Sequence, residues 1–134
     1  WAIGEALFAV GDHKGAVASF RRAAGVPAGG PAALRLAQAL LASGQLEASE
    51  HLAQQLLPTE PEAGLGVLLF DLAAGRDTRL ELDLTPETAH AALRQWVDAL
   101  LASDQPWLVR QVRSRVSVLG EIFPWLTGYL LKSA

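Results

Sequence analysis

The chain has 134 residues, of which 51% are hydrophobic and 19% are charged, with a formal net charge of −3 at pH 7 and no cysteine. This much apolar material favours an ordered domain over disorder, and the modest charge argues against a nucleic-acid-binding domain, which usually carries a basic patch and a high isoelectric point. Because cysteine is absent, neither a disulfide framework nor a cysteine-based zinc site can form.

A short pattern recurs along the chain, in which an apolar helical segment ends in a glycine or another turn-forming residue. Its copies read ALFAVGD at residues 6–12, ALLASGQ at 39–45, FDLAAGR at 70–76 and ALLASDQ at 99–105, so they start at intervals of 33, 31 and 29 residues. A left-handed glycine ends one helix, and Asp12 or Asp104 can cap the next. We therefore expect repeated pairs of antiparallel helices.

Two regular helix pairs are expected in residues 1–61. In the first unit the patterned positions are Ile3, Gly4, Leu7, Gly11, Asp12, Ala16, Phe20, Ala23 and Pro27. In the second unit the corresponding residues are Leu36, Ala37, Leu40, Gly44, Ser49, Ala53, Leu56 and Pro61. Ala16 and Ser49 are small enough to let the two helices of a pair cross closely, and Phe20 fills the groove between successive units.

These positions resemble the signature of the tetratricopeptide repeat family over about residues 1–61, and in a degenerate form beyond. The resemblance implies an all-α fold, a right-handed helix-turn-helix array of the tetratricopeptide-like α-solenoid type with an irregular C-terminal helical cap. It also implies a groove for a peptide or partner domain, lined by the first helix of each unit at Trp1, Glu5, Phe8, Leu34, Gln38 and Leu41. Alternatively, Trp1 and Phe8 pack against upstream residues or close the core.

A third helix followed by an irregular loop is expected between residues 62 and 84. Thr59 and Glu62 have capping-box spacing, and the apolar segment after them ends near Gly75. Residues 80–84 alternate with period two, which suits an extended segment. Residues 47–87 together carry a charge of −7, so this part of the surface is either simply solvated or prefers a basic partner.

Residues 85–134 are expected to form a degenerate helix pair and a capping helix, within a single domain of residues 1–134. Thr85 is placed to cap a helix with Pro86 at its first position, running to about Ala102, and another helix begins after Asp104. The apolar stretch at 122–131 would be the capping helix. Core packing is expected for three tryptophans, Trp96, Trp107 and Trp125.

No set of residues in the sequence predicts an enzyme. The three histidines, His13, His51 and His90, lie far apart. Glu47 and His51 can share a helix face, but two ligands do not close a metal site. Capping and solvation explain the charged clusters: Glu60 with Glu62, Glu81 with Asp83, and the basic run of Arg110, Arg113 and Arg115. We therefore expect no catalytic residue, no metal and no cofactor in this segment.

The leading hypothesis for function is a scaffold or adaptor that binds a protein or peptide partner, with no nucleic acid and no membrane insertion. No apolar run approaches the roughly 20 residues that span a bilayer. Two alternatives are an accessory or dimerisation region of a larger enzyme, for example a glycosyltransferase, and self-association into a homo-oligomer. The chain begins without methionine inside an expected helix, so we expect a segment of a longer protein, with a cytoplasmic location.

Overall fold

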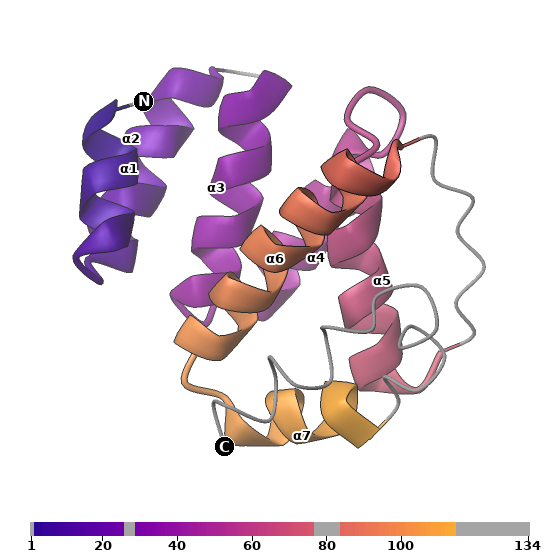
Figure 1. Cartoon of the computed structure of the whole chain (residues 1–134). Helices are drawn as coiled ribbons and strands as arrows, with labels where there is room; N and C mark the ends of the chain where they lie inside the picture. Colours follow the sequence, from indigo (N-terminus) through magenta and orange to yellow (C-terminus); the bar gives the residue numbers. More distant parts are fainter. Residues whose placement is uncertain (1, 26–28, 77–83, 115–134) are drawn as a thin grey trace.

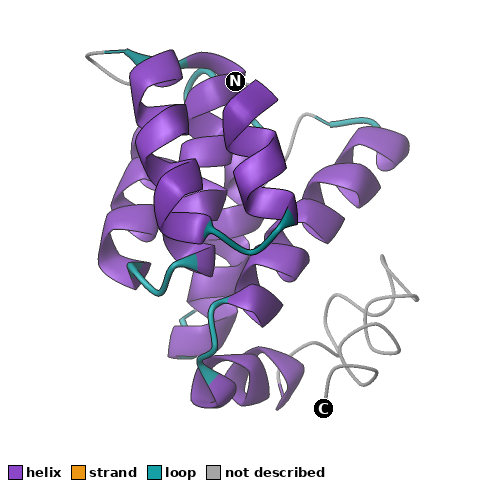
Figure 2. Cartoon of the chain, turned by 90° about the vertical axis from the view of Figure 1, so that its left-hand side faces the viewer, coloured by secondary structure: helices purple, strands orange, loops and turns teal. Residues whose placement is uncertain are grey.

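A computed structural model describes residues 2–25, 29–76 and 84–114, and these residues form seven helices and no strand (Figures 1 and 2). The helices are α1 (Ala2–Ala9), α2 (His13–Ala24), α3 (Gly30–Ala42), α4 (Leu46–Leu56), α5 (Ala63–Ala74), α6 (Pro86–Ala102) and α7 (Pro106–Ser114). The expected all-helical repeat fold is confirmed. The expected extended segment, apart from Leu84, and the expected capping helix at 122–131 lie outside the described residues.

Helices α1 to α4 form two antiparallel pairs that stack side by side (Figure 1). Each pair turns at a glycine in the left-handed conformation, Gly11 with φ 88° and Gly44 with φ 86°, a region that residues with a Cβ rarely adopt. The carboxylate of Asp12 accepts a hydrogen bond from the backbone N–H of Gly15 at 3.1 Å and so caps α2. The turn pattern in the sequence is confirmed in both units.

In each of the first two units, a small residue lies where the two helices of the pair cross closely. A Cβ built on Gly4 would lie 2.7 Å from Cε1 of Phe20, so α2 approaches α1 only because the glycine has no side chain. In the second unit the Ser49 hydroxyl donates to the carbonyl oxygen of Ala37 at 2.6 Å. The small residues of the pattern therefore lie at helix crossings, as predicted.

Phe20 is fully buried between three helices. Its ring lies over Gly4 within the first unit, and the guanidinium carbon of Arg35 on α3 lies 5.7 Å from its centroid. The side chain thus packs inside its own pair as well as toward the next unit.

Helix α5 starts differently from the prediction. Glu62 precedes α5 without a side-chain capping hydrogen bond, and the Thr59 hydroxyl donates to the carbonyl oxygen of Leu56 at 3.4 Å. The predicted capping box is therefore wrong, because Thr59 bonds backward to the end of α4. The predicted end of the helix is confirmed: Gly75 closes α5 with φ 72°.

Helix α6 leaves the side-by-side arrangement and packs on both α3 and α5 (Figure 1). It begins and ends where the sequence predicts, at Pro86 and Ala102, and the Thr85 hydroxyl accepts from the backbone N–H of Thr88 at 3.2 Å. At the α5 crossing, a Cβ built on Gly66 would lie 2.6 Å from Cζ2 and Cη2 of the Trp96 ring. Gly66 thus plays the part in the third unit that Gly4 plays in the first.

Helix α7 follows a turn at Asp104, which has a φ of 55°. Among the described residues it alone is a non-glycine residue with positive φ, and it stands where Gly11 and Gly44 stand in the earlier copies of the pattern. The residue directly before α7 is Gln105, whose carbonyl oxygen accepts from the backbone N–H groups of Leu108 and Val109 at 3.0 and 3.2 Å. Asp104 takes the place of the turn glycine, and its predicted capping role stays a prediction.

Candidate protein-binding surfaces

The groove predicted from the repeat alignment falls on α1 and α3, and the structure leaves only part of it accessible. Glu5 and Phe8 on α1 are half-buried, whereas Leu34, Gln38 and Leu41 on α3 are 5%, 0% and 1% exposed. Trp1 lies outside the described residues.

Helix α3 packs against α2, α4 and α6, and α6 lies against it at Gln38. The Gln38 amide nitrogen donates to the Gln95 side-chain oxygen of α6 at 3.3 Å. At the α1 end, the Arg35 guanidinium forms an ion pair with Glu5, with Nε 2.7 Å from Oε1, and its central carbon lies 4.8 Å from the Phe8 ring centroid. A guest reaches Gln38 in this arrangement only if α6 moves, so the full six-residue groove stays a prediction.

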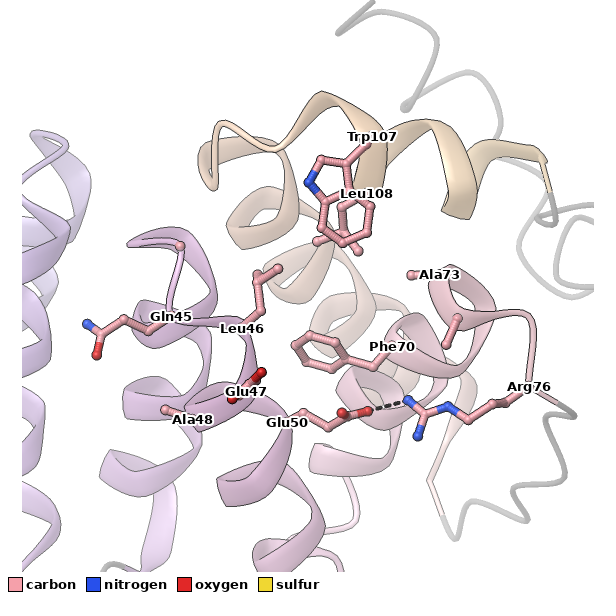
Figure 3. Close-up of a pocket in the computed structure, with 12 residues that line it drawn as sticks. Gln45, Leu46, Glu47, Ala48, Glu50, Phe70, Ala73, Arg76, Trp107 and Leu108 are labelled. Carbon is pink, nitrogen blue, oxygen red and sulfur yellow. Dashed lines mark hydrogen bonds and ion pairs between the residues drawn. The ribbon is translucent and has the colours of Figure 1, made fainter.

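A second surface is open, at the end of the array where α7 packs on α5 and faces α4 across a hollow (Figure 3). We call it the α4–α5–α7 hollow. It has a volume of about 730 Å³ and is lined by Gly44, Gln45, Leu46, Glu47, Ala48, Glu50, Phe70, Ala73, Ala74, Arg76, Trp107 and Leu108. This volume falls within the range of clefts that hold ligands in proteins.

The apolar part of the hollow combines a fixed floor with one exposed ring. Phe70 and Leu108 are 8% and 3% exposed and belong to the core, while the Trp107 side chain is 48% exposed. Leu108 and Val112 are four residues apart and set the buried face of α7, so Trp107 falls beside that face. Its indole N–H donates to the Gln105 side-chain oxygen at 2.8 Å, which holds the ring at the rim.

The opposite side of the hollow carries charge. Gly75 turns the chain so that the Arg76 backbone N–H donates to the carbonyl oxygen of Asp71 at 2.9 Å, a helix-ending bond of the left-handed type. The Arg76 guanidinium then pairs with Glu50 of α4 and, through Nε at 3.2 Å, with the Asp71 carboxylate. This pairing ties the end of α5 to α4 (Figure 3).

Burial and neighbouring charges shift the titration of this cluster. Burial raises the pKa of the Asp71 carboxyl, Arg76 opposes that rise, and Glu50 adds to it. The hydrogen bond to Glu50 raises the pKa of the Arg76 guanidinium, against a smaller effect of desolvation. Arg76 is therefore charged at any physiological pH, and its charge is shared between two carboxylates.

The family model for the tetratricopeptide repeat matches residues 7–66. Over these residues, which make up less than half of the chain, the sequence is similar to the tetratricopeptide repeat family. No curated protein and no solved structure matches the chain. Tetratricopeptide repeats generally mediate protein–protein interaction.

The tetratricopeptide segment contributes α4 to the hollow, and the helices after it contribute the rest. Sequence reasoning missed this site, because Trp107 was expected in the core together with Trp96. Trp96 is fully buried and its indole N–H donates to the carbonyl oxygen of Glu62 at 3.1 Å, which confirms the expectation there. The four-residue spacing of Leu108 and Val112 is the signal that would have placed Trp107 off the buried stripe.

In residues 2–25, 29–76 and 84–114, no group of three or more histidine or carboxylate side chains lies close enough to hold a metal ion. None of the described helices has the length and apolar character that crossing a bilayer requires.

Proposed function

We propose that the chain is a protein-interaction module that holds a segment of a partner polypeptide in the α4–α5–α7 hollow. The observation that carries the proposal is the Trp107 ring, which is 48% exposed at the rim of an open hollow with an apolar floor. Large exposed aromatic side chains beside well-packed pockets are the residues that most often dominate binding energy at protein interfaces.

The binding mechanism would be burial of apolar side chains without chemistry. Phe70 and Leu108 are held by the core before a guest arrives, so only the guest and the Trp107 side chain lose conformational freedom. Full burial of one leucine-sized side chain contributes about 1.5–3 kcal/mol. One such anchor does not offset the cost of association, and we therefore expect two or more anchors along the guest.

The inner face of α1 and α3 is a second surface for the same function. Its accessible residues are Glu5 and Phe8, and its deeper residues become available to a guest only when α6 is displaced. Trp96 and the Gln38–Gln95 hydrogen bond both hold α6 in place. For this reason we propose the hollow as the primary site.

Partner capture by single variants of the tagged chain tests the proposal. Trp107→Ala removes the exposed anchor and should reduce partner recovery at least tenfold. Val10→Ala is the matched control, because Val10 is an exposed apolar residue, 79% exposed, outside the hollow. Phe8→Ala reports on the inner face, and circular dichroism checks that each variant keeps its helices.

The outcomes separate the two surfaces. Loss of the partner with Trp107→Ala alone supports the hollow, and loss with Phe8→Ala alone refutes it in favour of the inner groove. Equal recovery by all three variants contradicts both surfaces. A captured partner that proves to be another part of the same polypeptide would support the accessory-region hypothesis instead.

A further inference from the structure

The charged side of the hollow indicates the chemistry of the guest. Two carboxylates, Glu50 and Asp71, pair with the Arg76 guanidinium, and a third, Glu47, also lines the hollow. Helix α4 contains Glu47 and Glu50 and no lysine or arginine. The local charge of these four groups is therefore negative, in the most acidic part of the sequence.

The charged groups of the hollow differ in whether they already have an ion-pair partner within the chain. Arg76 pairs with both Glu50 and Asp71, so its charge is committed within the chain. Glu47 is exposed, and among the described residues it has no ion-pair partner. Glu47 and Glu50 are three residues apart on α4 and so lie on one side of the helix. The unsatisfied charge that an incoming segment meets is negative.

The apolar and acidic parts follow one another across the hollow. Figure 3 places Trp107 and Leu108 on one side, Glu50 and Arg76 on the other, and Leu46 and Phe70 between them. A segment that crosses the hollow thus meets aromatic and aliphatic surface first and carboxylates next.

We propose that the guest is a cationic segment with apolar anchors, in which an apolar side chain inserts between Trp107 and Phe70 and a lysine or arginine pairs with Glu47. This inference rests on the proposed function of the hollow and names its partner chemistry. An acidic segment would bring its negative charge next to Glu47, which has no ion-pair partner among the described residues. Arg76 would not attract that segment, because two carboxylates already bind its guanidinium. A neutral apolar segment would gain the anchors only.

Three synthetic peptides test the charge preference on the full chain. All have the same length and the same two leucines four residues apart, and the flanking residues are lysine, serine or glutamate. Fluorescence anisotropy of the labelled peptides gives each Kd. We expect the lysine-flanked peptide to bind at least tenfold more tightly than the glutamate-flanked one at low salt. This difference should shrink in high salt, because exposed charges are screened.

Two variants should change the Kd of the lysine-flanked peptide in opposite directions. Glu47→Gln removes the free carboxylate and should weaken binding about two- to fivefold, the range expected for one exposed ion pair. Arg76→Gln removes the local cation and releases Glu50 and Asp71, and should tighten binding by a similar factor. Ala18→Lys on the exposed face of α2 changes the net charge by the same +1 as Glu47→Gln and should leave the Kd unchanged.

The results distinguish the charge preference from the site itself. Equal Kd values for the lysine- and glutamate-flanked peptides, with binding still lost in Trp107→Ala, overturn the cationic guest and leave the proposed function standing. If Glu47→Gln and Ala18→Lys weaken binding of the lysine-flanked peptide equally, the cationic guest is also overturned, because the net charge of the chain then explains the change in Kd. If no peptide binds and Trp107→Ala captures the partner as well as the unmodified chain does, both proposals fail.

Discussion

The substitution Gly66→Ala tests the crossing of α5 by α6, on which the irregular half of the fold depends. The new Cβ would lie 2.6 Å from two carbons of the Trp96 ring, a distance at which one of the two groups must shift. Trp96 is 0% exposed, so the ring has no solvent to move into. Its indole N–H also donates to the carbonyl oxygen of Glu62 at 3.1 Å, and a shift of the ring stretches that bond.

The expected magnitude follows from opposing effects. Replacing glycine by alanine in a helix is favourable by about 1 kcal/mol. Overpacking a close crossing costs about 1–3 kcal/mol, and a weakened buried hydrogen bond costs about 0.5–1.5 kcal/mol. The two costs together exceed the gain throughout this range, and we expect Gly66→Ala to lower the free energy of unfolding by about 0.5–3.5 kcal/mol.

Urea unfolding followed by circular dichroism measures this change, and a double-mutant cycle with Trp96→Leu identifies its cause. In the Trp96→Leu background the smaller side chain leaves room for the Cβ, so Gly66→Ala should become neutral or stabilising. A Gly66→Ala variant as stable as the unmodified chain, or an equal effect in both backgrounds, would refute the crossing.

Two further substitutions probe the turn and the charged cluster. Asp104 holds a left-handed φ of 55°, so Asp104→Gly should raise the free energy of unfolding by up to about 1 kcal/mol; a loss of stability in urea would contradict this. Burial raises the pKa of the Asp71 carboxyl, so protonation stabilises the folded state. This contribution is full below the ordinary carboxyl pKa and is lost as pH rises through the raised pKa. Asp71→Asn should therefore increase stability at pH 7 and flatten the pH dependence of the unfolding midpoint in that window, and an unchanged slope would count against it.

The elements fixed by local chemistry were predictable from the sequence. Gly11, Gly44 and Gly75 end their helices in the left-handed conformation, and Asp12 and Thr85 cap the helices that follow them. Each of these features depends on residues within one turn of the chain. For that reason the ends of these helices and the starts of α2 and α6 could be predicted from the sequence.

The features that depend on distant residues were not predictable from the same patterns. Gln38 was expected as a polar residue of an open groove, but it is fully buried, and its amide nitrogen donates to the side-chain oxygen of Gln95, far along the chain. Gly66 gave no local signal of its role, since only the path of α6 brings Trp96 onto it. The hollow likewise requires α4, α5 and α7 to meet, and no repeat pattern specifies that meeting.

The most direct test of the hollow as a binding site compares two tryptophans in one sample. The indole N–H of Trp107 lies at the rim of the hollow, bonded to Gln105, whereas that of Trp96 is buried and bonded to Glu62. Indole ¹⁵N–¹H spectra of the full chain, with Trp107→Phe to assign the signal, are recorded while the lysine-flanked peptide is added. We predict a saturable shift of the Trp107 signal and an unmoved Trp96 signal; binding that leaves Trp107 unchanged, or that moves Trp96 instead, would contradict the proposed site.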